Sequence, residues 1–138
     1  MAETLADTRI QAFLATRPVA VLATLEPDGA PLAIAMWFLP GPDRLTMVSV
    51  ANTRKVRNLR RDPRVAVVAE AGAGADLRGV TVQGRAAFLE SPDHAALVDR
   101  LLARYPDLKR RWGGRAMPAD RVMFQVIPER VWSWGLDG

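Results

Sequence analysis

Short apolar runs separated by turns that contain proline and glycine dominate this chain. The runs at 18–25 (PVAVLATL) and 31–39 (PLAIAMWFL) flank a Pro-Asp-Gly turn at 27–29, and this arrangement predicts a β-hairpin. Further β-type runs lie at 44–50, 64–70, 77–90 and 121–134, and Gly79 and Gly84 in the third of these are expected to mark bulges or close approaches. Because hairpin-type turns join most neighbouring runs, the pattern predicts a mostly antiparallel barrel.

Helical spacing of apolar residues is confined to shorter segments. A first helix is expected at 4–16, with Thr4 as its cap. Its apolar face would consist of Ala6, Ile10, Phe13 and Leu14. A second helix is expected within 53–63, a third begins at 91–93 (SPD), and a helical turn is expected at 108–112. These helices would cap the barrel.

Size and composition favour one ordinary globular domain spanning residues 1–138. The chain is 49% hydrophobic and 25% charged, which argues against extended disorder. It has no cysteine, so disulfides, thiolate nucleophiles and zinc–sulfur sites are excluded. The N-terminus lacks the apolar region of a signal peptide, and no uncharged stretch reaches the roughly 20 residues of a membrane span. These features predict a cytoplasmic protein.

Positive charge is concentrated in one short segment. Residues 53–64 (TRKVRNLRRDPR) hold six of the 19 basic residues against one acid, Asp62, in a chain of formal net charge +4. Asn52 or Thr53 would cap a helix that starts here, so free backbone N–H groups and the positive end of the helix dipole would face one place. The side chains expected to bind an anion such as phosphate there are Arg54, Lys55 and Arg57. Lys55 and Asn58 are three residues apart and would share a face at the capped end, whereas Val56 and Leu59 would face inward. The alternative is a solvated surface helix whose arginines only aid solubility.

The sequence contains no conventional catalytic set. His94 is the only histidine and is expected at the surface near a helix start, so it is assigned no role and no metal site is predicted. Gly72 and Gly74 begin a dinucleotide fingerprint, but Leu77 stands where the third glycine belongs and a strand follows. If the protein carries out a reaction, a bound cofactor must supply most of the chemistry.

Tryptophans provide a second signal. Trp132 and Trp134 alternate near the C-terminus, so both point to one side of the final strand. We expect them at a sheet edge, in a subunit contact or in the wall of a cleft that binds a ring. Trp37, which ends an apolar run, is equally consistent with core packing and with a contact role.

The order of these features resembles the pyridoxamine-phosphate-oxidase-like split-barrel family, and within it the flavin/deazaflavin-dependent oxidoreductase branch. The resemblance extends over residues 10–135, and its most specific part is KVRNLRRDPRV at 55–65. The family implies a mainly β fold, a six-stranded antiparallel split β-barrel with peripheral helices. It also implies a homodimer with FMN or coenzyme F420 between the subunits. The chain lacks the additional C-terminal region of true pyridoxamine phosphate oxidases, so vitamin B6 oxidation is not expected.

The resemblance also implies a set of cofactor-binding residues. Lys55 matches the lysine that binds the cofactor phosphate. The residues expected around that phosphate are Thr53, Arg54, Arg57 and Asn58. The residues expected beside the ring are Ala35, Met36, Trp37, Val48, Ser49 and Val50. Trp132 and Trp134 are expected to reach the site from the partner subunit.

The implied function is an oxidoreductase that transfers hydride from reduced coenzyme F420 or FMN to a small organic substrate. Coenzyme F420 is preferred because 55–65 is most similar to members that use it. The alternative is a non-catalytic protein of the same fold that binds or carries a flavin, coenzyme F420 or haem. Nucleic-acid binding through the arginine-rich helix is a third hypothesis. Against it, no stacking aromatic lies within 53–64 and no recognised nucleic-acid motif is present.

Overall fold

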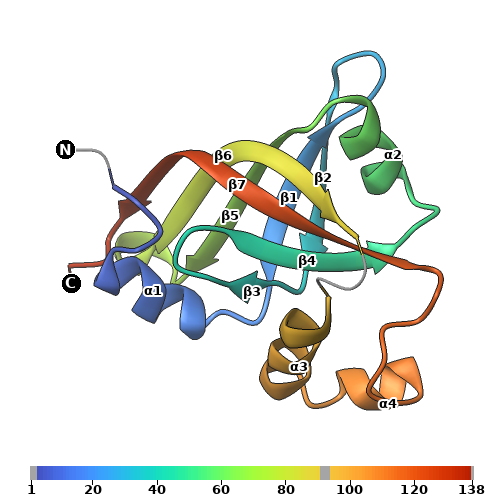
Figure 1. Cartoon of the computed structure of the whole chain (residues 1–138). Helices are drawn as coiled ribbons and strands as arrows, with labels where there is room; N and C mark the ends of the chain where they lie inside the picture. The colour runs from blue at the N-terminus through green and yellow to red at the C-terminus, as the bar shows by residue number, and fades with distance from the viewer. Residues whose placement is uncertain (1–2, 91–93, 138) are drawn as a thin grey trace.

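The computed structural model describes residues 3–90 and 94–137. Its centre is one sheet in the order β2-β1-β5-β6-β7-β4-β3, and every neighbouring pair is antiparallel (Figure 1). The strands are β1 (Ala20–Leu25), β2 (Pro31–Met36), β3 (Leu39–Pro40), β4 (Leu45–Val50), β5 (Arg64–Ala71), β6 (Arg78–Leu89) and β7 (Arg121–Trp134). The sheet curls into a barrel that stays split, because β2 and β3 form its two edges.

This architecture confirms the predicted mainly β split barrel with peripheral helices. The described part of the chain has seven strands where six were expected. The extra strand is β3, which is only two residues long and pairs with β4 through Leu39–Thr46 and Pro40–Leu45. The proline and glycine turn between β3 and β4 is tight enough to let this short pairing form.

The first hairpin forms as its sequence predicts. Gly29 adopts a left-handed backbone conformation (φ +88°), which would strain a residue with a side chain. The Asp28 carboxylate accepts the Ala30 N–H at 3.0 Å and stabilises the turn. The register then places Ala20 opposite Met36, so the C-terminal end of β2 lies beside the start of β1.

Two glycines permit the long pairing of β6 with β7. A Cβ on Gly84 would lie 2.0 Å from the Ile127 carbonyl oxygen, next to the register shift between Gln83 and Gly84. A Cβ on Gly79 would lie 2.6 Å from the ring of Trp134. Both positions therefore need glycine for close approach, as the sequence suggested.

The main core fills the inside of the barrel. It is built from the inward side of the strands and the apolar face of α1 (Thr8–Ala15). Fully buried members include Ile10, Leu14, Leu22, Met47, Val82 and Phe124. Among the described residues, no helix has the length and apolar character needed to cross a membrane.

The start of the first helix differs from the prediction. Asp7, not Thr4, is its cap, because the Asp7 carboxylate accepts the Arg9 N–H at 2.8 Å. Thr4 lies in the preceding turn, where its carbonyl accepts the Asp7 N–H at 3.1 Å. The predicted inward face of the helix is confirmed at Ile10, Phe13 and Leu14.

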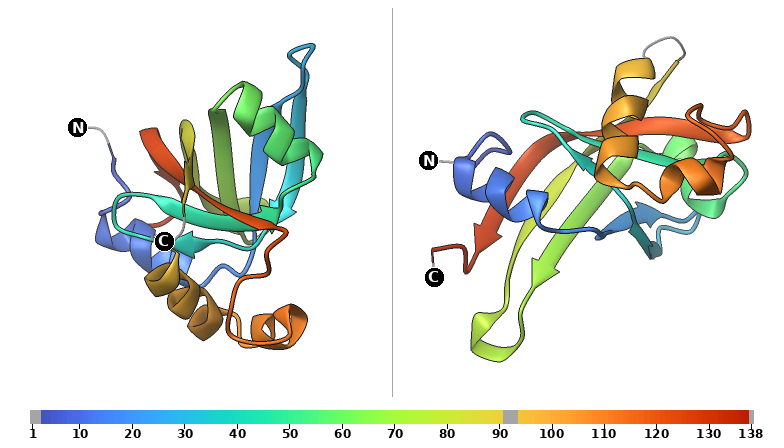
Figure 2. Two further views of the ribbon diagram at one scale, coloured as in Figure 1. Left: turned by 45° about the vertical axis from the view of Figure 1, so that its right-hand side comes forward. Right: turned by 90° about the horizontal axis from the view of Figure 1, so that it is seen from below.

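A second, smaller core joins α3 (Ala95–Arg104) and α4 (Leu108–Trp112) to the outside of the barrel beside β3, β4 and β7 (Figure 2). Its buried residues are Leu39, Val98, Leu101, Leu102, Tyr105, Leu108 and Met123. The predicted helix start at 91–93 lies outside the described residues. The remaining helices are α2 (Arg54–Arg61), at the end of the barrel opposite α1 (Figure 1), and the short 3-10 turn η1 (Gly74–Asp76).

Candidate functional site

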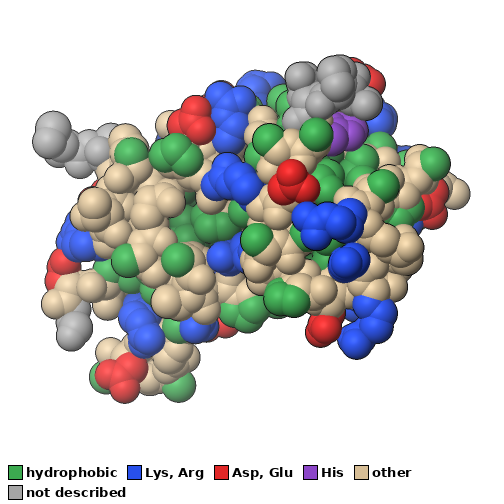
Figure 3. Space-filling model, turned by 60° about the horizontal axis from the view of Figure 1, so that its bottom comes forward, with side chains coloured by type: hydrophobic (Ala, Val, Ile, Leu, Met, Phe, Trp, Pro, Cys, Tyr) green, Lys and Arg blue, Asp and Glu red, His purple; other side chains and the backbone are tan. Residues whose placement is uncertain are grey.

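A pocket of about 490 Å³ lies where the C-terminal ends of β2 and β4 meet α2, α3 and α4. Seven of its lining residues belong to the set expected from the sequence: Ala35, Met36, Trp37, Val48, Ser49, Val50 and Lys55. Six more complete the lining: Leu101, Tyr105, Leu108, Arg111, Trp112 and Arg121. Figure 3 shows the lower side of the molecule, where Lys and Arg side chains are spread among exposed hydrophobic ones.

Lys55 brings positive charge to this pocket from the first turn of α2. Its side chain is half-buried, and burial lowers the pKa of its ammonium group below the ordinary value. Within the described residues it makes no ion pair or side-chain hydrogen bond, and none of the pocket-lining residues is acidic. An anion in the pocket would therefore relieve the unfavourable burial of this charge.

The other expected phosphate ligands on α2 have partners within the chain. Arg54 forms an ion pair with Glu26, and Arg57 donates to the Asn52 side-chain oxygen at 2.9 Å. Thr53 occupies the cap position, but the predicted side-chain cap is wrong. Its hydroxyl donates to the Val50 carbonyl at 3.1 Å, and the Thr53 side chain makes no hydrogen bond to the first N–H groups of the helix.

Asn58 does not share the face of Lys55, contrary to the expectation from helical spacing. It is 2% exposed and lies under the helix, where its amide donates to the Thr24 hydroxyl at 3.0 Å. Arg61 donates to the Asn58 side-chain oxygen at 3.1 Å. Val56 and Leu59 are buried beside it, as predicted. Asn58 therefore anchors α2 to β1 and does not line the pocket.

An aromatic pair forms the opposite wall. The rings of Trp37 and Tyr105 stack with centroids 4.8 Å apart and planes 5° from parallel. The Tyr105 hydroxyl accepts the Phe38 N–H at 3.1 Å and lies 2.8 Å from the Pro18 carbonyl oxygen. These contacts hold the connection between β2 and β3 against the end of α3, so the wall is well anchored.

Arg111 and Arg121 add two cations that the sequence analysis did not select. The guanidinium carbon of Arg111 lies 5.3 Å from the centre of a Trp37 ring, within range of a cation–π contact. Arg121 is paired with Asp120 at 2.5 Å. The basic segment 108–112 (LKRRW) could have indicated Arg111, but no sequence pattern in this segment showed that it would pack against Trp37.

Trp132 and Trp134 do not line this pocket. They lie toward the C-terminal end of β7, opposite Thr81 and Gly79 respectively. Trp132 is 42% exposed. Their expected role as residues of a partner subunit stays a prediction.

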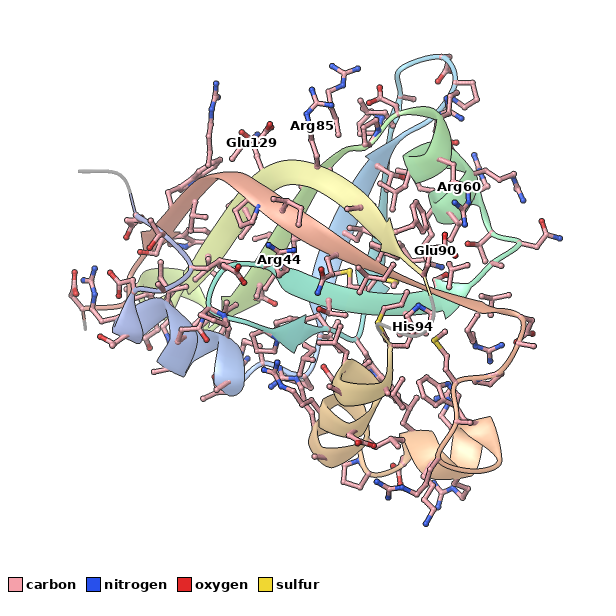
Figure 4. The ribbon with its side chains drawn as sticks, in the orientation of Figure 1. Arg44, Arg60, Arg85, Glu90, His94 and Glu129 are labelled. Atoms are coloured by element: carbon pink, nitrogen blue, oxygen red, sulfur yellow. The ribbon has the colours of Figure 1, made fainter. Side chains whose placement is uncertain are left out.

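Two further polar residues have local structural roles. Arg60, labelled in Figure 4, places its guanidinium carbon 4.0 Å from the centre of the Phe88 ring. His94, also labelled there, has its Nε2 atom 2.8 Å from the Leu89 carbonyl oxygen and is not part of the pocket. No group of three His, Cys, Asp or Glu side chains suited to a metal occurs among residues 3–90 and 94–137.

Known proteins share this sequence pattern and fold. The sequence model of the family described as pyridoxamine 5'-phosphate oxidase matches residues 6–135. A conserved hypothetical protein from Mycobacterium tuberculosis is 30% identical, with a TM-score of 0.78 over 94% of this chain and 84% of that protein. An FAD-binding protein from Mesorhizobium loti is 24% identical, with a TM-score of 0.74 over 96% of this chain and 94% of that one. The heme storage protein HutZ from Vibrio cholerae is 18% identical, with a TM-score of 0.77 over 96% and 94% of the two chains.

Proposed function

The chain belongs to the pyridoxamine 5'-phosphate oxidase family, and on that premise we propose that it is an oxidoreductase that binds FMN or coenzyme F420 in the pocket beside Lys55. The observation that carries the proposal is the meeting of Lys55 with the ends of β2 and β4 in one pocket free of acidic side chains. Similarity to an FAD-binding protein supports a flavin-type cofactor. The preference for coenzyme F420 rests on the sequence of 55–65 alone.

The lining residues fit such a cofactor. Lys55 would bind the phosphate, and its partly buried charge gains most from a bound anion. Met36, Trp37, Val48 and Val50 give apolar surface for a flat ring. A reduced flavin or deazaflavin supplies two electrons as hydride, and a proton from solvent completes the reduction of a small organic substrate.

The protein's own contribution is to bind, orient and exclude water. None of the lining residues is Asp, Glu or His. The Ser49 hydroxyl donates to the Val50 carbonyl at 3.0 Å, and the Tyr105 hydroxyl is surrounded by backbone groups. These two hydroxyls therefore have structural partners, and hydride transfer is a reaction that positioning alone can accelerate.

A homodimer is part of the proposal, because the pocket opens beside an apolar row on the outer face of the sheet. The register places five residues side by side across five strands, and directly opposed residues share a face. The row consists of Ala35, Val21, Val68, Thr81 and Trp132. Ala35 lines the pocket at one end, and Trp132 is exposed at the other.

In a homodimer with a two-fold axis, this row would pack against the same row of the partner subunit, and the two rows would run in opposite directions. Trp132 of the partner subunit would then lie near the pocket end, which gives the terminal tryptophans the role expected from the sequence. Sedimentation of the purified protein should show a particle of twice the chain mass. A monomer at micromolar concentration would contradict this part of the proposal.

Charge reversal at Lys55 tests the cofactor site. Lys55→Glu should weaken binding of FMN or coenzyme F420 by roughly 10- to 100-fold, because it replaces a charge-assisted contact with repulsion. Arg57→Glu is the matched control, since Arg57 is on the same helix but is exposed and bonded to Asn52. Binding is measured by fluorescence titration of each cofactor. Equal losses in both variants, or none in Lys55→Glu, would contradict the site.

The second candidate is a binding protein of the same fold that carries a flavin or haem without turnover. It is favoured by the absence of acidic side chains from the pocket lining and by the shared fold of the heme storage protein. His94, the only histidine, lies outside the pocket, which disfavours a histidine-bound haem there. Stoichiometric cofactor binding without reduction of any acceptor would select this candidate.

A further inference from the structure

We propose that the substrate of this pocket is a small planar carboxylate held by the guanidinium of Arg111 against Trp37. This inference rests on the proposed function, because it assigns Lys55 to the cofactor and Arg111 to the molecule that the cofactor reduces. The two cations come from different walls of the pocket, Lys55 from α2 and Arg111 from α4. They can therefore bind two separate anions at once.

Arg111 has no acidic partner among the described residues. Three nearby arginines do have one: Arg110 pairs with Asp107 at 3.3 Å, Arg115 with Asp99 at 3.6 Å, and Arg121 with Asp120 at 2.5 Å. No acidic residue lines the pocket. The five N–H donors of Arg111 are thus free for a ligand.

The geometry around Arg111 suits a carboxylate attached to a flat apolar group. The guanidinium lies 5.3 Å from the centre of a Trp37 ring, and Trp37 is itself stacked on Tyr105. An arginine that rests on an aromatic surface loses little side-chain freedom when it binds and presents two parallel donors to a planar acceptor. The same aromatic wall and the apolar side chains of Leu101 and Leu108 suit an unsaturated or aromatic body on that carboxylate.

Benzoate and benzamide provide a matched pair of probes, since they share shape and differ in charge. Calorimetry on the full chain should show benzoate binding roughly 10-fold more tightly than benzamide, because the exposed Arg111 makes a strong but solvent-screened contact. Arg111→Gln should remove that preference. Arg110→Gln is the control, because it changes the adjacent residue, which is paired with Asp107. Arg111→Lys keeps the charge without the planar fork and should restore only part of the preference.

Equal affinity for the two probes in the wild-type protein would overturn the inference, as would an equal loss in Arg110→Gln. Cofactor titration of the same variants separates this result from the fate of the proposed function. If Arg111→Gln weakens FMN binding as much as Lys55→Glu does, Arg111 holds the cofactor and the inference is wrong. If the wild-type protein binds neither FMN nor coenzyme F420 but keeps an Arg111-dependent preference for benzoate, the proposed cofactor fails and the carboxylate site stands.

Discussion

The two basic helices, α2 and α4, each bring one cation to the pocket, although α2 carries more positive charge. In α2, Arg54, Arg57, Arg60 and Arg61 are all engaged with other parts of the chain, and only Lys55 is left for the pocket. In α4, Arg110 has one exposed ion pair, and Arg111 reaches the pocket and Trp37. The more strongly charged helix therefore offers the pocket no more cations than the weaker one.

The difference shows that a cluster of arginines in a sequence does not by itself mark an anion site. Guanidinium groups donate readily to backbone carbonyls, side-chain amides and carboxylates, and each such hydrogen bond removes donors from a ligand. Arg61, for example, donates to the Leu25 carbonyl as well as to Asn58. What identifies a binding cation is the lack of such partners together with a position in a pocket.

The comparison predicts that α2 matters more to the fold than α4 does. Leu59 belongs to the main core, whereas Leu108 belongs to the smaller core outside the barrel. Leu59→Ala should lower the free energy of unfolding by about 4–5 kcal/mol, and Leu108→Ala by about 2–3 kcal/mol. Urea unfolding followed by circular dichroism measures both. A larger loss of stability in Leu108→Ala than in Leu59→Ala would contradict the expected difference between the two helices.

A smaller effect is expected at Tyr105, where the end of α3 meets the barrel. Tyr105→Phe removes the hydroxyl that accepts the buried Phe38 N–H at 3.1 Å, so the free energy of unfolding should fall by about 1–3 kcal/mol. The ring stack on Trp37 can persist, because the aromatic ring is kept. Benzoate affinity should therefore fall less than in Arg111→Gln. If Tyr105→Phe left stability unchanged, this hydroxyl would not be what anchors the aromatic wall.

The smallest expected effect is on the pH dependence of stability, and it concerns Asp62 at the C-terminal end of α2. Hydrogen bonds from the Arg64 side chain and backbone hold the pKa of Asp62 at about 2, below its ordinary value of 3.8. A carboxylate with a lowered pKa stabilises the fold above its unfolded pKa, and this contribution is lost as pH falls toward the folded value. Asp62→Asn should therefore flatten the loss of stability between about pH 4 and about pH 2. Urea midpoints at several pH values measure this, and parallel curves for the two proteins would contradict it.

Local sequence patterns predicted most of the fold, and the family resemblance indicated about half of the residues that line the candidate site. The Pro-Asp-Gly hairpin, the inward faces of α1 and α2, and the two close-approach glycines were all visible in residue spacing. Each of these features depends on residues that are close together in the sequence. The cap at Thr4 was wrong because Asp7 offers the same chemistry one turn later. The position of Asn58 was wrong because spacing along a helix does not show which face a neighbouring strand will cover.

By itself, the sequence determined the antiparallel barrel, since alternation and turn residues are local properties of the chain. Its resemblance to a known family indicated the strand ends that line the pocket with Lys55. Only the tertiary structure decided that Tyr105 and Arg111 complete that pocket. Tyr105 meets Phe38 across 67 positions of sequence, through the packing of α3 and α4 on the barrel. The tertiary structure also decided which arginines remain without a hydrogen-bond or ion-pair partner, because such partners come from distant parts of the chain that folding brings close.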